Sequence, residues 1–79
     1  MEKAKLGDYV TAKLVGENDC RQGVFIKDNG DGTIIVKGEL DEYLCEGSNN
    51  VGVVPDKNLL FDDTRKFVTE TRKKYNLLQ

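Results

Sequence analysis

The 79-residue sequence predicts a mainly β domain of the α+β class, in which five short strands are followed by one amphipathic C-terminal helix. Three observations support this fold class. Segments with alternating apolar and polar residues recur through residues 6–61, as is typical of strands. Clusters of Gly, Asn and Asp separate them, and these residues favour turns. From Asp62 onward, the apolar residues are spaced by three or four positions, which is the period of a helix.

The strongest local signal is the segment Asp28-Asn29-Gly30-Asp31-Gly32. Gly, Asn and Asp tolerate the positive φ angles of tight hairpins, so this segment predicts a β-hairpin turn with a bulge-type glycine. Val10, Ala12 and Leu14 alternate with polar neighbours and are expected to share one face of the first strand. The five predicted strands cover residues 8–15, 23–27, 33–37, 42–46 and 51–54.

The predicted helix covers residues 62–77, with Asp62 or Asp63 as its N-terminal cap. We expect its apolar face to pack over an open end of the β module, or otherwise to serve a dimer or a partner groove. Before it, residues 55–61 are expected to form a turn that places Leu59, Leu60 or Phe61 in the core. The apolar face consists of Thr64, Phe67, Val68, Thr71, Tyr75 and Leu78.

The arrangement of the strands resembles the SH3-like barrels of the Tudor and KOW type. The residues that carry this resemblance are Gly7-Asp8, Val10 and Ala12 in the first strand, Gly23-Val24 in the second, and the Asp28–Gly32 turn before Thr33-Ile34-Ile35-Val36. The resemblance implies a small five-stranded barrel over residues 6–61. Tudor modules bind methylated side chains in an aromatic cage, whereas this chain has no Trp and no aromatic cluster in the segments between its strands.

Length and composition predict one domain over residues 1–79, because so short a chain supports a single core. The net charge is −2: residues 1–61 carry 7 basic and 11 acidic groups, and residues 62–79 carry 5 and 3. No apolar stretch reaches the about 18 residues of a membrane span, and no signal peptide is recognisable. We therefore predict a cytoplasmic protein in which Cys20 and Cys45 are free thiols, with a disulfide or a redox role as the alternatives.

Residues that could carry catalysis are scarce. The chain contains no His, which is the commonest general base and metal ligand. Two cysteines alone do not complete a zinc site, and no glycine-rich phosphate-binding motif is present. The sequence therefore predicts a non-enzymatic protein without a metal or another cofactor.

Two charged segments are candidate binding surfaces. The first is acidic and is expected to dock on a basic partner protein; the alternative is a solvated hairpin whose charges prevent edge pairing. Its candidate residues are Glu39, Asp41, Glu42, Tyr43, Leu44 and Glu46. The second is the basic helix face, which could contact nucleic acid weakly or be merely solvated. Its candidate residues are Arg65, Lys66, Arg72, Lys73 and Lys74.

These features predict a small protein-interaction module, monomeric or homodimeric, that serves as an accessory or regulatory factor of bacterial or phage type. The alternative is a weak nucleic-acid-binding module that uses the basic helix.

Overall fold

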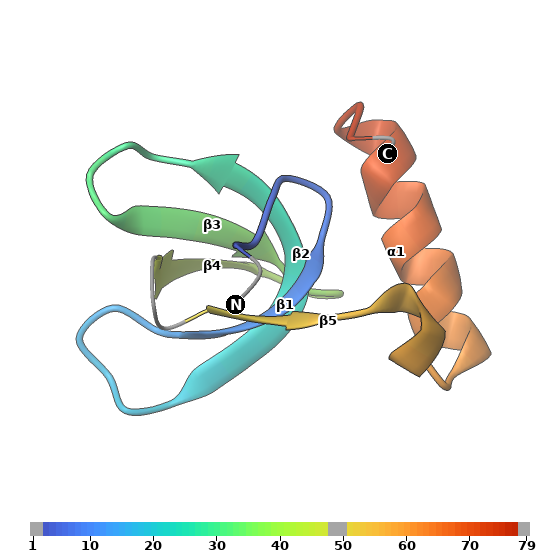
Figure 1. Ribbon diagram of the computed structural model, residues 1–79, viewed down its shortest axis with the longest axis horizontal. Helices are drawn as coiled ribbons and strands as arrows, with labels where there is room; N and C mark the ends of the chain where they lie inside the picture. The colour runs from blue at the N-terminus through green and yellow to red at the C-terminus, as the bar shows by residue number, and fades with distance from the viewer. Residues whose placement is uncertain (1–2, 48–50, 78–79) are drawn as a thin grey trace.

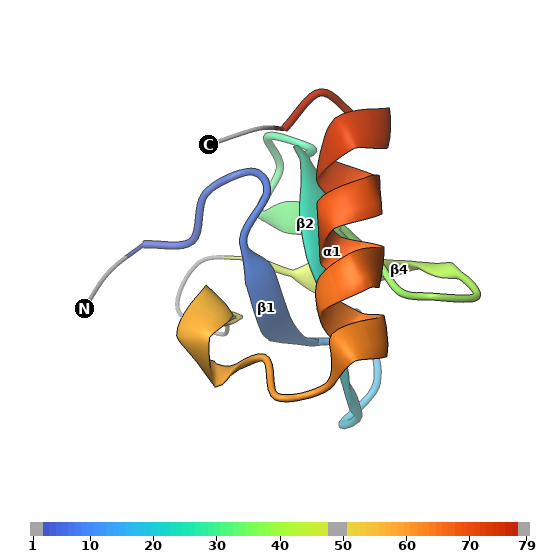
Figure 2. The ribbon, with the colours of Figure 1, turned by 90° about the vertical axis from the view of Figure 1, so that its right-hand side faces the viewer.

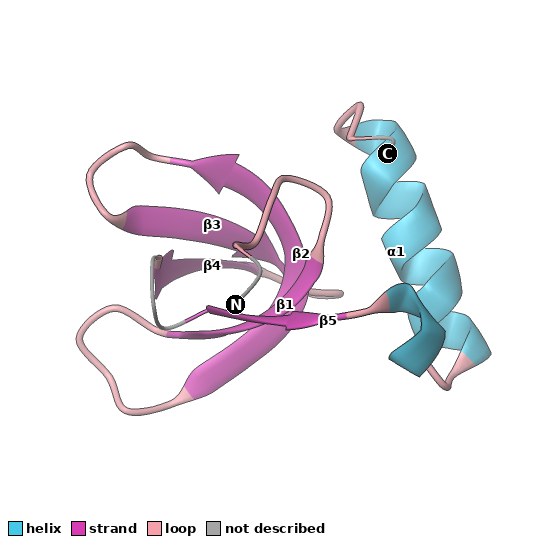
Figure 3. Cartoon of the chain, in the orientation of Figure 1, coloured by secondary structure: helices cyan, strands magenta, loops and turns pink. Residues whose placement is uncertain are grey.

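The computed structural model describes residues 3–47 and 51–77 of the chain. It is mainly β, with five antiparallel strands in one open sheet and one C-terminal helix (Figures 1 and 3). The mainly β class, the five strands and the helix predicted from the sequence are therefore confirmed. The elements are β1 (Tyr9–Lys13), β2 (Cys20–Asp28), β3 (Thr33–Lys37), β4 (Glu42–Glu46), β5 (Val51–Val54), the 3₁₀ turn η2 (Asp56–Asn58) and α1 (Asp62–Lys74).

The strand order in the sheet is β4-β3-β2-β1-β5, so four consecutive strands form a meander and β5 returns beside β1. The sheet curls strongly enough for Leu14, which follows β1, to form an isolated bridge with Cys45 of β4. The two edge strands β4 and β5 do not pair with each other within the described part of the chain. The predicted barrel is thus only partly formed, because the curled sheet remains open.

The β2–β3 hairpin confirms the strongest local prediction. Gly30 and Gly32 have φ angles of 81° and 90°, which ordinary residues adopt only at a cost. The Asp28 carboxylate accepts a hydrogen bond of 2.9 Å from the Gly30 amide, an Asx-type contact that closes the turn. Within the strands, the register shifts between Phe25 and Lys27, so β2 carries a bulge where the sheet bends.

The first core cluster lies inside the curled sheet. Val10 and Ala12 are fully buried there, and Leu14 packs against them, as the alternation in β1 predicted. Phe25 enters this cluster from β2, whereas its neighbour Val24 points to the opposite face of the sheet. Both faces of β2 are therefore covered. The buried members are Val10, Ala12, Phe25, Ile34, Val36 and Cys45.

The second cluster fills the space between the sheet and α1 and consists of Val24, Leu59 and Val68. Figure 2 shows α1 lying across the sheet in front of β2. The turn η2 delivers Leu59 to this cluster with 6% exposure, whereas Leu60 and Phe61 stay exposed. The helix thus packs on the β module, as expected, and only one of the three apolar residues before it enters the core.

Both ends of α1 differ from the prediction. The N-cap is Phe61 rather than an aspartate, and no side chain caps this end. Asp62 and Asp63 instead lie in the first turn, where their negative charge still suits the helix dipole. The helix ends at Lys74, three residues before the predicted end at 77, because Asn76 adopts a left-handed conformation with a φ of 59°. The predicted Leu78 lies outside the described residues.

Candidate functional site

A groove lies where the β3–β4 turn approaches α1, and we call it the helix–sheet groove. Three aromatic rings line it: Tyr9 from β1, Tyr43 from β4 and Phe67 from α1. Its volume is about 330 Å³, near the lower end of the range for small-molecule sites. The other lining residues are Arg21, Gln22, Gly38, Glu39, Leu40 and Thr64.

Two features position these rings: side chains alternate between the two faces of each strand, and one glycine lies in close contact with Tyr43. Tyr9 precedes the buried Val10 and therefore faces the side of the sheet on which α1 packs. Phe67 precedes Val68 on α1 and borders the second core cluster. Tyr43 packs against the first cluster, and a β-carbon at Gly38 would lie only 2.7 Å from its ring carbon Cε2. Glycine at position 38 thus leaves room for the Tyr43 ring.

Charged side chains of the protein itself already approach two of the rings. The Arg21 guanidinium carbon lies 5.6 Å from the centre of the Tyr43 ring, and the Lys37 ammonium lies 5.9 Å from that of Phe67. Both distances suit cation–π attraction. Partial burial, followed by the nearby charge of Glu39, raises the pKa of Tyr9 above its usual value. Tyr9 therefore presents a neutral phenol to the groove at neutral pH.

A second hollow of about 190 Å³ continues from the groove, and Tyr9, Gln22 and Thr64 line both. Its remaining walls are nearly all apolar and come from β5, η2 and the residues before α1. They are Val54, Asn58, Leu59, Leu60 and Phe61.

Three large apolar side chains border these hollows but are mostly exposed. Leu40 is 91% exposed at the tip of the β3–β4 turn, and Leu60 and Phe61 are 77% and 74% exposed before α1. We call these three residues the apolar rim. The two hollows and the apolar rim form one continuous surface, because the rim residues also line the hollows.

Comparisons with protein families, curated proteins and solved structures gave no match. Among residues 3–47 and 51–77, no group of three or more Cys, Asp or Glu side chains is arranged to hold a metal ion. None of the described helices has the length and apolar character needed to cross a membrane. Cys20 and Cys45 are free, the first exposed and the second buried.

The predicted acidic contact is divided between two faces of β4. Glu39, Asp41 and Glu42 are exposed on or beside the β3–β4 turn, where the Gly38 amide donates a 2.8 Å hydrogen bond to the Asp41 carbonyl. Tyr43 points to the groove side of the strand, whereas Leu44 and Glu46 point to the other side.

Glu46 is engaged within the protein, since its carboxylate accepts a hydrogen bond of 2.9 Å from the Lys13 ammonium. Of the six acidic-segment candidates, the structure therefore brings Glu39 and Tyr43 to the groove and places Asp41 on the same β3–β4 turn. Glu42 lies on the face of β4 that Leu44 and Glu46 share. Leu44 is half exposed on the opposite face of the sheet.

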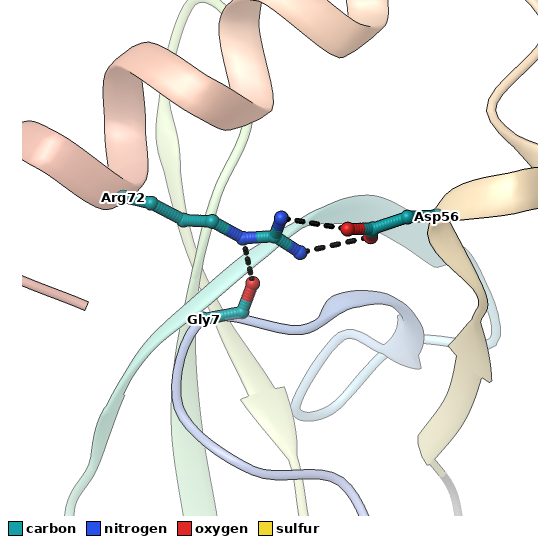
Figure 4. Close-up of polar contacts among 3 residues, drawn as sticks. All are labelled: Gly7, Asp56 and Arg72. Carbon is teal, nitrogen blue, oxygen red and sulfur yellow. Dashed lines mark hydrogen bonds and ion pairs between the residues drawn. The ribbon is translucent and has the colours of Figure 1, made fainter. Parts of the chain in front are cut away.

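The predicted basic stripe is likewise divided. Arg72 donates from Nε to the Gly7 carbonyl at 2.8 Å and from its two Nη atoms to the Asp56 carboxylate at 2.8 and 2.9 Å (Figure 4). Arg65 donates to the Leu59 carbonyl at 2.7 Å and also pairs with Asp62. Arg72, whose side chain is 15% exposed, thus joins α1 to other segments, whereas Arg65 is 52% exposed and contacts only the start of the helix and the residue Leu59 before it.

The three lysines of the stripe remain exposed. Lys66 and Lys73 lie on the outer side of α1, and the Lys74 ammonium lies 5.6 Å from the Tyr75 ring centre. Fewer than five basic groups are thus available to a phosphate backbone.

Sequence reasoning did not assign Tyr9 or the apolar rim to a site. It gave Phe67 a contact role only in the alternative in which the apolar face of the helix serves a dimer or a partner groove. One signal pointed to the rim: Leu59, Leu60 and Phe61 are three consecutive apolar residues, and a single turn cannot bury all of them. The meeting of Tyr9, Tyr43 and Phe67 has no local signal, because these residues come from three elements that only the tertiary fold brings together.

Proposed function

We propose that this protein is a non-enzymatic interaction module, an accessory or regulatory factor of bacterial or phage type, which binds a partner protein at the helix–sheet groove. The observation that carries the proposal is the apolar rim beside two continuous hollows. Single exposed apolar residues are common on protein surfaces. Three large ones around a hollowed, ring-lined surface are typical of an interaction site.

Phe61 provides a separate argument. It occupies the N-cap of α1, a position where Ser, Asp and Asn stabilise a helix and large apolar residues do not. It makes no cap hydrogen bond and is mostly exposed, so its side chain contributes little to the fold. Residues that conflict with a local preference, such as the preference for polar residues at a helix N-cap, tend to occur at functional sites. A role in contacting a partner accounts for a phenylalanine at this position.

We also propose that the β module is an SH3-like barrel of the Tudor and KOW type that is open at one side. The position of β5 beside β1 and the bridge between Leu14 and Cys45 support this relationship. We place the protein in the cytoplasm, as its free cysteines suggest, as a monomer or a homodimer.

The test is site-specific cross-linking. A photoreactive amino acid replaces Leu40 at the apolar rim, or Asn29 at the tip of the β2–β3 hairpin, which lies on the side opposite α1 (Figure 1). We expect the probe at position 40, but not at 29, to link a defined protein in extracts of the producing cells.

The Phe61→Ser variant tests whether the cross-link at position 40 depends on the apolar rim. Because serine is a favourable N-cap, we expect the variant to gain up to about 1 kcal/mol in free energy of unfolding. We also expect it to lose the cross-link at position 40, and this loss cannot be attributed to unfolding. Equal labelling from positions 40 and 29, or a cross-link that Phe61→Ser leaves unchanged, would contradict the proposal.

The weak nucleic-acid-binding function is the competing proposal. It depends on Lys66, Lys73 and Lys74, since Arg65 and Arg72 are held by other groups. Gel shifts at low salt decide it. We expect no shift at tens of micromolar protein; a shift that Lys66→Ser and Lys73→Ser abolish would favour nucleic acid over a protein partner.

A further inference from the structure

We propose that the groove binds a short basic segment of another protein, in which one large apolar residue is flanked by lysines or arginines. This inference rests on the proposed function and adds the chemistry of the occupant. It follows from three observations: the unpaired carboxylates beside the apolar rim, the neutral walls of the second hollow, and the cations already held at the aromatic rings.

The carboxylates lie at both ends of the surface. At the β3–β4 turn, Glu39 and Asp41 flank Leu40 in the sequence, and their side chains make no ion pair or hydrogen bond with any described residue. At the other end, Asp62 and Asp63 directly follow the exposed Phe61. Asp62 pairs with Arg65, so Asp63 is the carboxylate at this end that makes no ion pair with a described residue. Exposed apolar groups next to negative charge are complementary to a segment that carries apolar groups next to positive charge.

The second hollow suits the apolar residue. Four of its eight lining residues are aliphatic or phenylalanine side chains, and none of the eight is charged. The four are Val54, Leu59, Leu60 and Phe61. At about 190 Å³ it is smaller than typical small-molecule sites, which begin at roughly 300 Å³, but it can accept one side chain. An aromatic or aliphatic anchor in such a pocket is the usual centre of a protein interface.

The rings of the groove do not favour a second cation. Arg21 already lies over Tyr43, and Lys37 already lies over Phe67. A lysine or arginine of the partner placed between these rings would meet two like charges. The basic residues of the occupant therefore contact the outer carboxylates, whereas its apolar residue enters the hollow.

A second copy of this chain is the main competing occupant. The last turn of α1 carries Lys73, Lys74 and Tyr75, so it also combines basic and aromatic residues. However, Lys74 lies over the Tyr75 ring, and Tyr75 is only partly exposed. This segment is therefore less suited to enter a pocket than a free peptide.

The experiment uses three synthetic probes of equal length and the full chain. The first is Gly-Lys-Lys-Phe-Lys-Lys-Gly, the second has Glu in place of each Lys, and the third has Ser in place of Phe. Amide chemical shifts locate the binding, and titration at two salt concentrations gives the dissociation constants. We expect the first probe to shift the amides of residues 38–42 and 59–64. The other two should bind at least about tenfold more weakly, as expected when a central anchor or its complementary charges are removed.

Two charge variants with the same change in net charge separate local from general attraction. Glu39→Gln with Asp41→Asn removes two exposed carboxylates from the β3–β4 turn beside the groove. Glu17→Gln with Asp19→Asn removes two exposed carboxylates from the β1–β2 turn, which lies on the side opposite α1 (Figure 1). We expect the first pair to weaken binding of the lysine probe by about tenfold and the second pair to change it less than about twofold.

Several results would overturn the inference. Equal binding of the glutamate and lysine probes shows that the occupant is not basic. Sedimentation of the protein as an oligomer that Phe61→Ser converts to a monomer shows that the occupant is a second copy. If no probe shifts the groove amides while the cross-link at Leu40 persists and depends on Phe61, the occupant chemistry is wrong and the proposed function stands. If that cross-link is also absent, both are wrong.

Discussion

Arg72 joins α1 to two other segments of the chain through a single side chain that is only 15% exposed. Its three hydrogen bonds reach Gly7 and Asp56 in a fork that matches the planar guanidinium. Lysine has one ammonium group and cannot reproduce this geometry. We expect Arg72→Lys to lower the free energy of unfolding in urea by about 1–2 kcal/mol, a moderate value because Asp56 is largely exposed and its ion pair is screened.

Lys73→Ala is the control for this substitution, because Lys73 is exposed on the same turn and makes no ion pair with a described residue. Its effect should stay within about 0.5 kcal/mol. If the two variants were equally stable, Arg72 would not be the link between α1 and the rest of the fold.

Asp56 makes this link sensitive to acid. The hydrogen bonds from Arg72 lower the pKa of the Asp56 carboxyl below its usual value. A group whose pKa is lowered by folding stabilises the protein fully above its unfolded-state pKa, about 3.9 for aspartate, and loses that contribution as the pH falls through the folded-state pKa. We therefore expect wild type to be more stable than Asp56→Asn at pH 6, and this advantage to shrink below about pH 4.

Urea unfolding of both proteins at pH 6 and at pH 3 measures this advantage. A difference in free energy that stays constant over this range would show that the Arg72–Asp56 pair does not contribute to acid sensitivity.

At the scale of elements, the C-terminal end of α1 is the best-defined boundary. The Leu77 amide donates to the Arg72 carbonyl at 2.7 Å and the Asn76 amide to the Lys73 carbonyl at 3.2 Å, which together form a Schellman motif. Asn76 supplies the left-handed residue that this motif requires. Because glycine adopts this conformation without strain, Asn76→Gly should raise the free energy of unfolding by up to about 1 kcal/mol.

Asn76→Ala should have the opposite effect to Asn76→Gly and lower the free energy of unfolding by about 1 kcal/mol, because the β-carbon of alanine disfavours positive φ. Urea denaturation followed by helical circular dichroism checks both variants. The same sign for both would mean that the backbone conformation of residue 76 does not control this helix end.

The signals that predicted the elements were local. Alternation placed Val10, Ala12 and Leu14 on one face of the first strand, and the glycines of the β2–β3 turn favoured positive φ, so these features could be predicted from the sequence. The N-cap was mispredicted because the aspartates after Phe61 have the favoured chemistry but lie one and two residues too late.

The candidate site depends on the whole molecule, and for this reason the sequence indicated only part of it. The acidic turn was recognisable from its charges alone. The groove exists because the curl of the sheet and the crossing of α1 bring Tyr9, Tyr43 and Phe67 together, and neither is encoded by a local pattern. Similarly, the charge pattern of α1 did not reveal that Arg65 and Arg72 bind backbone carbonyls of other segments.

The packing of α1 on β2 predicts that helix and sheet unfold together. Val68 is 1% exposed and contacts Val24 and Leu59, so Val68→Ala removes buried apolar area from the only cluster that α1 shares with the sheet within the described chain. We expect a loss of about 2 kcal/mol in free energy of unfolding. The control Leu60→Ala, at a residue 77% exposed, should change the free energy of unfolding by less than about 0.5 kcal/mol.

Hydrogen exchange shows whether the helix and the sheet unfold together or whether the helix unfolds separately. In a cooperative fold, Val68→Ala reduces the protection of the amides of β2 and of α1 by the same free energy, whereas a loss confined to α1 would show that the β module is stable without its helix.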